Sequence, residues 1–417
     1  MKPTQEIFNN LPQLSLNERD RRWAIIRKWM NDEDIDCLLV IGNDLAFGLG
    51  MCNVRYISNI GSRHGGFLIF PRDGEPTGFF QPYHMTLPIH PNTLSQNWVS
   101  DVRWNPGIEK VISIMKEKVS PLKKVALISG ANGLQRENTP FTIYQAILDN
   151  LKGVEVVNGS RFIMEMRKIK SEEEISLLRE AGKIQRKMIQ TMIDTTEEGV
   201  TEADVYSAMV STMLKNGGEA EIFNLLHSGP TQSNEFQHLL HGLDPNIGPT
   251  MRRLRKGDTV IAETHVTYGG YMTAAEFTVC VGPVDDRYKR IFDAAVECLN
   301  VLMEKVKPGN TFIDAIEAEK AVLKKCGLGW LELGLHAHGL GSPEVPECVY
   351  MGMDPNTWQV TKEMEKVVFE ENMVFGTNID LHDPAFRSDV GVMYGDTILV
   401  KEKPELLVHV PQVLSIK

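Results

Sequence analysis

Two strand-like segments joined by a pair of glycines constrain the fold of this chain more than any other feature. Apolar and polar residues alternate through Asp258–Thr267 and again through Tyr271–Val281, as is typical of β-strands. The connection around Gly269-Gly270 is a turn signal, because glycine adopts the positive φ angles that tight hairpins need. The sequence therefore predicts a long antiparallel hairpin in the second half of the chain.

Helices are predicted on both sides of this hairpin. Ser171 is followed three residues later by Glu174, a capping-box pattern that predicts a helix beginning after Lys170. A second capped helix is expected from Thr201. Later elements are predicted as helices at about 286–305 and 312–325 and as strands at 373–380 and 391–400. This part of the chain is therefore predicted to be α+β.

The first part of the chain follows a different pattern, in which helices and strands alternate. A helix is expected over about 17–30 and a buried strand over 35–41. Further strands are expected at 66–70, 78–80 and 125–128, and further helices at 108–118 and 142–151. This alternation is typical of an α/β domain. We therefore predict two domains, residues 1–160 and residues 161–417.

The charge balance limits the kinds of partner. The 417 residues include 44 Lys and Arg against 55 Asp and Glu, a formal net charge of −11. Proteins that bind nucleic acids or anionic membranes generally present a basic surface. We therefore expect a small-molecule substrate, and neither nucleic acid nor a membrane as partner.

The compartment is predicted from the N-terminus and the cysteines. The first thirty residues mix charged and apolar side chains and do not resemble a secretion signal, and no apolar run is long enough to span a bilayer. The six cysteines are scattered and form no CxxC pair. This distribution favours free thiols in a reducing compartment, so a cytoplasmic protein is predicted.

Six short motifs occur in the order and approximate spacing of one known family. They are Arg167–Ser171, Lys256–Asp258, Tyr268–Tyr271, His338–Gly341, Met373–Phe375 and Asp396–Val400. With these motifs the chain resembles the aminopeptidase P, prolidase and creatinase family. The resemblance implies a creatinase-like α/β N-terminal domain followed by an α+β pita-bread catalytic domain.

The resemblance also indicates where most family members hold two divalent ions. Their ligands, two aspartates, a histidine and two glutamates, fall here on Glu263, Ala274, His338, Asn378 and Gly395. Only the histidine is kept, and the alanine and glycine side chains have no donor atom. Two hard cations need several anionic oxygens. We therefore expect no dinuclear centre and predict that the protein uses no metal or other cofactor.

Strand alternation predicts which ionisable groups share the pocket. Residues two apart on a strand face the same side, so Glu263 and His265 point together, and Ala274 and Glu276 do the same on the neighbouring strand. With His338 this gives two carboxylates and two imidazoles in one site. Neighbouring groups of these types shift each other's pKa values toward neutrality, which suits acid/base catalysis.

The hairpin is most similar to that of creatinase, a metal-free member of the family. The segment Tyr271–Thr278 matches the pattern Tyr-x-Thr-Ala-x-Glu-x-Thr. The resemblance implies that the Glu276 carboxylate binds a planar cation of the substrate. It also implies that His241 transfers protons, with His238 as the alternative, and that Arg63 binds a carboxylate in the partner subunit's site. Creatinase has glutamate at position 378 and arginine at position 277, so Asn378 and Phe277 indicate a substrate other than creatine.

Three functions follow as hypotheses. The first is a homodimeric, metal-independent hydrolase that cleaves a C–N bond in a small guanidino, amidino or amide substrate bearing a carboxylate. Its predicted catalytic residues are His241, Glu276 and His338, and its predicted substrate-binding residues are Arg63, Glu263, His265 and Asn378. The second is a metal-dependent Xaa-Pro peptidase with a rebuilt site for one ion such as zinc or manganese. The third is a non-catalytic binding protein on the same fold.

Overall fold

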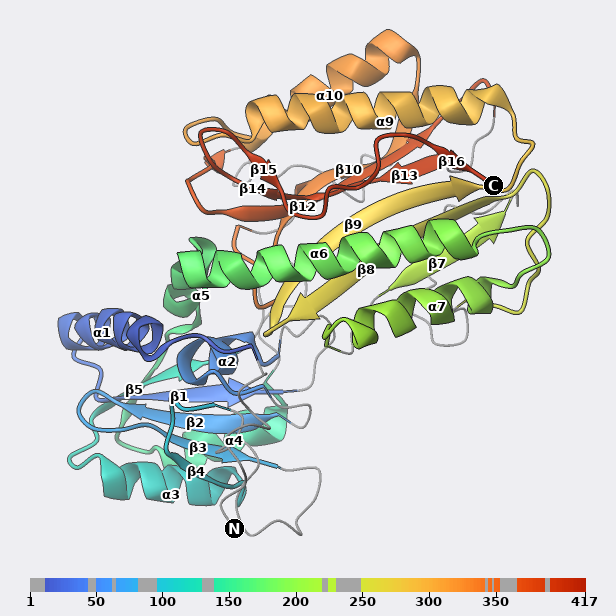
Figure 1. The fold of residues 1–417 in the computed structure, drawn as a ribbon. Helices are drawn as coiled ribbons and strands as arrows, with labels where there is room; N and C mark the ends of the chain where they lie inside the picture. Colours follow the sequence, from blue (N-terminus) through green and yellow to red (C-terminus); the bar gives the residue numbers. More distant parts are fainter. Residues whose placement is uncertain are drawn as a thin grey trace. The chain divides into compact units, whose positions relative to one another are not determined.

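The chain forms two compact units, Met1–Lys168 and Ile169–Lys417 (Figure 1). The computed structural model describes residues 12–43, 50–61, 65–81, 96–129, 139–219, 224–229, 249–341, 344–346, 349–352, 366–386 and 391–417. The predicted domain boundary at residue 160 lies at the start of helix α5 (Ser160–Lys168), which belongs entirely to the first unit.

The first unit is built on a six-stranded sheet with the strand order β4-β3-β2-β1-β5-β6. Its strands are β1 (Cys37–Gly42), β2 (Gly66–Pro71), β3 (Thr77–Phe80), β4 (Asp101–Trp104), β5 (Lys124–Ile128) and β6 (Glu155–Asn158). Its helices are α1 (Leu16–Asp32), α2 (Cys52–Ser58), α3 (Ile108–Lys118), α4 (Phe141–Asn150) and α5. Because β1 and β2 are buried along their whole length, the centre of the sheet is covered on both faces, as in an α/β domain.

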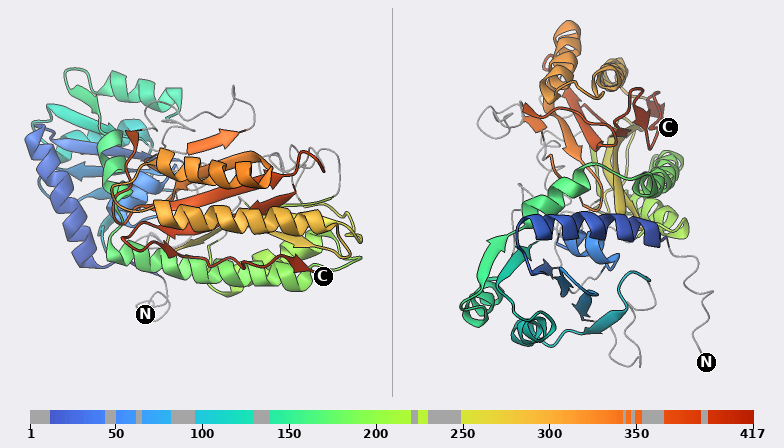
Figure 2. Two further views of the ribbon diagram at one scale, coloured as in Figure 1. Left: turned by 90° about the horizontal axis from the view of Figure 1, so that it is seen from above. Right: turned by 90° about the vertical axis from the view of Figure 1, so that its left-hand side faces the viewer.

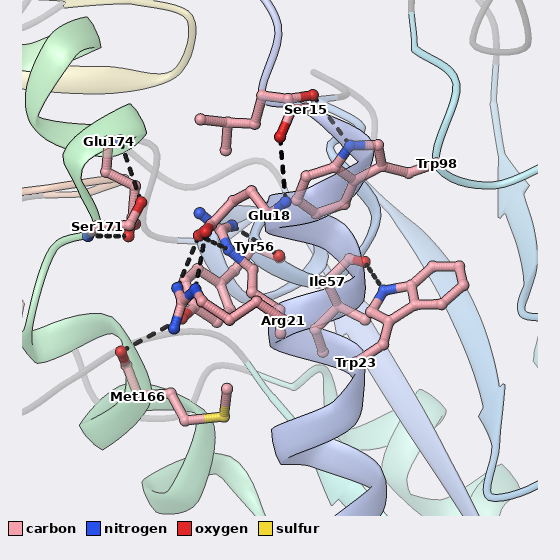
Figure 3. A network of polar contacts seen from close by, with 12 residues as sticks. Ser15, Glu18, Arg21, Trp23, Tyr56, Ile57, Trp98, Met166, Ser171 and Glu174 are labelled. Atoms are coloured by element: carbon pink, nitrogen blue, oxygen red, sulfur yellow. Dashed lines mark hydrogen bonds and ion pairs between the residues drawn. The ribbon is translucent and has the colours of Figure 1, made fainter.

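Helix α1 is tied to the rest of the first unit by buried polar contacts, some of which Figure 3 shows. The Glu18 carboxylate accepts a hydrogen bond from Nε of Arg22 at 2.7 Å, and the Arg22 guanidinium donates to the Tyr56 carbonyl at 2.9 Å. The Trp23 indole donates to the Ile57 carbonyl at 2.8 Å. These bonds satisfy the charged and polar groups that the helix buries, so its apolar face can pack against the unit.

The second unit contains two sheets. One has the strand order β16-β9-β8-β7, and the other has the order β11-β10-β12-β14-β15, with β13 paired to β12. The strands are β7 (Leu225–Gly229), β8 (Thr259–Tyr268), β9 (Tyr271–Cys280), β10 (Gly329–Ala337), β11 (Val349–Gly352), β12 (Val374–His382), β13 (Val392–Tyr394), β14 (Thr397–Leu399), β15 (Glu405–Leu406) and β16 (Ser415–Ile416).

Four long helices cover these sheets on two sides (Figures 1 and 2). They are α6 (Glu172–Thr195), α7 (Glu202–Lys215), α9 (Asp286–Lys305) and α10 (Phe312–Cys326). Helices α6 and α7 pack against β7, β8 and β9, whereas α9 and α10 pack against β10, β12 and β13. One apolar core connects the helices to both sheets. Within the described ranges, no helix has both the length and the apolar composition needed to cross a membrane.

The predicted hairpin forms from β8 and β9. Its antiparallel register runs from Thr259 opposite Cys280 to Tyr268 opposite Tyr271. Gly269 and Gly270 make the turn with φ angles of 59° and 88°, a conformation that other residues adopt only with strain. The hairpin therefore supplies two long, buried strands on which a site can be built.

Candidate functional site

Two pairs of carboxylates face each other across the strand pairs of the second unit. In the hairpin, Glu263 on β8 lies opposite Glu276 on β9. In the other sheet, Glu332 on β10 lies opposite Asp380 on β12. The sheets are joined at this point because the backbones of Glu276 and Gly395 exchange two hydrogen bonds of 3.1 Å. We call Glu263, Glu276, Glu332 and Asp380 the carboxylate cluster.

Glu276 bridges the two sheets through its side chain as well as its backbone. Its Oε1 accepts a hydrogen bond from the Asn378 amide at 2.9 Å, and its Oε2 accepts one from the Ile379 N–H at 3.3 Å. A Cβ atom on Gly395 would lie 3.3 Å from Oε2 and only 2.1 Å from the Thr377 carbonyl oxygen. Glycine at position 395 therefore leaves room for both the β12 backbone and the Glu276 carboxyl group.

The four carboxyl groups of the cluster resist ionisation. Burial raises the pKa of Glu263 to about 8, with repulsion from Glu332 adding to the effect, and burial raises the pKa of Glu332 to about 7. The pKa values of Glu276 and Asp380 are raised well above the ordinary range by burial and then by repulsion from their carboxylate neighbours. Four negative charges cannot coexist here unless protons or a cation neutralise them.

Three imidazoles lie beside the carboxylate cluster. The ring centroids of His336 and His338 are 4.4 Å apart, and those of His265 and His338 are 5.9 Å apart. Burial lowers the pKa of His336 to about 4 and lowers the pKa of His338 well below its usual value. A Cβ atom on Gly376 would lie 2.6 Å from Nε2 of His338, so this glycine makes room for the rings. Both imidazoles are therefore neutral at physiological pH.

The turn that carries His338 is held by a buried ion pair. Nζ of Lys170 lies 2.8 Å from Oε2 of Glu344, and the two side chains are only 1% and 2% exposed. Oε1 of Glu344 accepts a hydrogen bond from the Leu340 N–H at 2.9 Å. A Cβ atom on Gly339 would lie 2.4 Å from Oε2 of Glu344. The ion pair thus requires glycine at position 339, directly after the histidine.

The structure brings several of the predicted site residues together. Glu263 and Glu276 are opposite each other, His265 lies opposite Ala274, and His338 lies beside His265. Asn378 connects the two sheets, because its Oδ1 lies 2.8 Å from Nε2 of His336 while its amide donates to Glu276. Arg63, His241 and His238 lie outside the described residues. The roles assigned to all these residues stay predictions.

Sequence reasoning missed three members of the site, namely Glu332, His336 and Asp380. The signal was alternation along β10 and β12. His336 precedes His338 by two residues, and Asp380 follows Asn378 by two. Each therefore points to the same side as a predicted site residue. The predicted strand at 373–380 contained Asp380, but no strand was predicted over β10, and so the second carboxylate pair was not found.

Comparisons with known proteins establish the family. Residues 22–169 match the creatinase/prolidase N-terminal domain, and residues 176–402, more than half of the chain, match metallopeptidase family M24. The chain therefore belongs to family M24, whose members are hydrolases acting on C–N bonds. The predicted family, the two-part fold with its pita-bread domain and the prediction of a C–N hydrolase are confirmed.

Individual relatives agree with this assignment. The chain is 24% identical to an Xaa-Pro dipeptidase of Pyrococcus horikoshii over 389 residues, which cover 92% of this chain and 95% of the relative. It is also 24% identical to an Xaa-Pro dipeptidase of Lactobacillus helveticus over 63% of this chain and 68% of that one. The fold is similar to that of an X-Pro aminopeptidase from Thermotoga maritima, with a TM-score of 0.74 and 16% identity over 95% and 99% of the two chains.

The prediction that the protein uses no cofactor is wrong, and with it the metal-independent mechanism, because the chain matches a metallopeptidase family and its relatives include Xaa-Pro dipeptidases. The five positions implied by the family resemblance do not include the second carboxylate pair, Glu332 and Asp380. Among the described residues, no three His, Cys, Asp or Glu side chains are gathered tightly enough to hold an ion as they lie. The four carboxyl groups are of the chemical type that hard divalent ions bind, and Oδ1 of Asp380 is buried without a hydrogen-bond partner, but the side chains do not surround a common point.

Proposed function

We propose that this protein is a metal-dependent hydrolase of Xaa-Pro dipeptides. The observation that carries the proposal is the carboxylate cluster at the junction of the two sheets, in a chain that matches an Xaa-Pro dipeptidase over nearly its full length. The cluster offers oxygen donors of the type that hard divalent ions prefer. The site thus combines a family that hydrolyses C–N bonds with side chains that could hold the ion such enzymes use.

The chain's own residues supply the rest of the chemistry. A divalent ion held by the carboxylate cluster would lower the pKa of a bound water and polarise a carbonyl group. His338 and His265 lie beside the cluster as buried rings, and a neutral imidazole can accept a proton at a ring nitrogen. Asn378 holds the Glu276 carboxyl group in place through its amide, so that this group keeps a fixed position at the junction.

Several earlier predictions remain part of the proposal. Arg63 would bind the carboxylate of the dipeptide, and His241 would assist proton transfer. If Arg63 acts in the neighbouring subunit's site, the active enzyme is a homodimer. We also retain the cytoplasmic location, where free cysteines are stable.

Chelation and reconstitution test the proposed function. The purified protein, treated with EDTA and dialysed, should not hydrolyse Xaa-Pro dipeptides, and addition of Mn²⁺, Zn²⁺ or Co²⁺ should restore the hydrolysis. Dipeptides of the same composition without proline, and creatine, serve as control substrates. Hydrolysis that survives chelation, or turnover of creatine alone, would contradict the proposal.

A further inference from the structure

We infer that the second unit carries a further binding site, a groove between helix α6 and the C-terminal segment 405–412 that takes a small organic carboxylate. The groove has a volume of about 450 Å³, and the residues that line it are Arg186, Gln190, Leu406, His409, Val410, Pro411 and Gln412. None of these lining side chains is acidic, although the whole chain has a formal net charge of −11. The groove therefore offers an anion a cationic and partly apolar surface on an acidic protein.

The C-terminal segment is held close to α6 along the groove (Figure 2). A Cβ atom on Gly182 of the helix would lie only 2.1 Å from the carbonyl oxygen of Leu407, so glycine at this position permits the close approach. The Leu407 N–H donates a hydrogen bond of 2.8 Å to the Thr397 carbonyl of β14. Both walls of the groove are thus fixed by the fold, and a ligand does not have to order them.

His409 lies at the groove in an unusual backbone conformation. Its φ angle is 60°, in the left-handed region that residues with a side chain rarely adopt. The buried Asp396 carboxylate stabilises this conformation, because its oxygens accept hydrogen bonds from the N–H groups of Val408 at 3.0 Å and Val410 at 2.8 Å, on either side of His409. The exposed imidazole is therefore held at the groove by a fixed backbone, and its ring N–H can donate to a ligand.

A comparison of two arginines of α6 shows that the groove lacks a carboxylate. Arg179 lies seven residues before Arg186, about two helical turns away on the same side of the helix. The Arg179 guanidinium donates two hydrogen bonds of 2.7 and 2.8 Å to the carboxylate of Glu405. Gln412, seven residues after Glu405, lines the groove with Arg186, and Arg186 forms no ion pair within the described part of the chain. The second guanidinium is thus available to an anionic ligand.

The ligand class follows from the side chains of the groove. A guanidinium binds a carboxylate through two parallel hydrogen bonds, which fix the orientation of the ligand. Leu406, Val410 and Pro411 supply an apolar wall beside the arginine. This combination suits a carboxylate attached to a short aliphatic chain better than a fully hydrated inorganic anion, because the aliphatic chain buries apolar surface against the wall.

The groove and the candidate functional site lie on opposite sides of the hairpin. Gln185, the residue before Arg186 in α6, donates hydrogen bonds to the Thr264 carbonyl at 2.6 Å and to the Thr264 hydroxyl at 3.0 Å. The Thr264 side chain therefore faces α6. Its neighbours in β8, Glu263 and His265, point away from the helix because side chains alternate along a strand. A ligand in the groove does not contact the carboxylate cluster, so its binding can be measured separately from hydrolysis.

Binding of 4-methylpentanoate to full-length chains tests the inference. Arg186→Gln removes the guanidinium from the groove. Lys187→Gln is the matched control, because it removes one positive charge from the next residue of α6, which does not line the groove. Dissociation constants are measured by ligand-observed NMR at constant ionic strength. Acetate, which lacks the aliphatic chain, and 4-methylpentanol, which lacks the charge, serve as control ligands. Amide hydrogen exchange in the segment 405–412 is measured with and without 4-methylpentanoate.

We expect wild type to bind 4-methylpentanoate with a dissociation constant on the order of 1 mM, and Arg186→Gln to bind it at least about fivefold more weakly. Lys187→Gln should bind as wild type does, both control ligands should bind more weakly, and the ligand should slow exchange in the segment 405–412. Equal binding by wild type and Arg186→Gln would overturn the inference. It is also overturned if both variants lose affinity equally, which indicates general attraction of anions, or if wild type does not bind 4-methylpentanoate.

Discussion

At the scale of single residues, the most unusual group outside the site is Glu319. Its side chain is fully buried in helix α10, and neither carboxyl oxygen has a hydrogen-bond partner. Burial raises the pKa of this carboxyl group well above its ordinary value. The folded protein therefore keeps a proton that the unfolded chain releases at a lower pH.

This difference predicts that Glu319 makes stability depend on pH. Because the pKa is raised in the folded state, the contribution is fully present below the unfolded pKa and is lost as pH rises toward the folded pKa, by roughly 1.4 kcal/mol per pH unit within that window. Urea unfolding at several values between pH 5 and pH 8 should show a steeper decline for wild type than for Glu319→Gln. Parallel curves for the two proteins would contradict the prediction.

At the scale of elements, the turn after β10 depends on contacts distant in sequence. Lys170 immediately precedes the capping box of α6, and Glu344 follows the turn that carries His338. A buried ion pair contributes little net stability, but removal of one partner leaves an uncompensated buried charge. The turn is thus sensitive to either residue alone.

We predict that Lys170→Met lowers the free energy of unfolding by about 3 to 5 kcal/mol. The double variant Lys170→Met/Glu344→Gln should recover much of this loss, because the remaining amide is neutral and still accepts the Leu340 N–H. Denaturant unfolding of both proteins measures the difference. Equal stability of the single and double variants, or a loss below about 1 kcal/mol in the single variant, would show that the pair is not buried as described.

Local sequence patterns predicted several elements well. The capping boxes at Ser171 and Thr201 are present, and the hairpin turns at Gly269-Gly270. These features depend on neighbouring residues only, so a local pattern is enough to identify them. Strand β10 was not predicted; it contains Gly329 and Gly334, and glycine weakens the local signal of a strand.

At the scale of the whole molecule, the chain has two compact units with separate apolar cores. The four carboxylates and three imidazoles of the site all lie in the second unit. A ligand stabilises the part of the protein that it contacts. Ion binding should therefore affect the two units differently.

We predict that Mn²⁺ slows amide hydrogen exchange in β8, β9, β10 and β12. The exchange rates in the sheet of the first unit should stay the same. Hydrogen exchange followed by mass spectrometry on the full chain, with and without Mn²⁺, measures both regions in one experiment. The first unit's strand β1 serves as the internal control. Equal protection of both units would indicate that the ion binds elsewhere or acts through the whole chain.

The sequence alone determined the family, the two-part architecture and one side of the site. Motif order, helix caps and strand alternation are local properties, and they placed Glu263, His265 and Glu276 on one face of a hairpin. The tertiary structure decided which other side chains lie beside that face of the hairpin. Only the pairing of β10 with β12, and its junction with the hairpin at Gly395, brings Glu332 and Asp380 to the same place. The positions aligned with the family's metal ligands lack most of their donors, yet four carboxyl groups meet here, because strands β10 and β12 bring Glu332 and Asp380 to the pair Glu263 and Glu276.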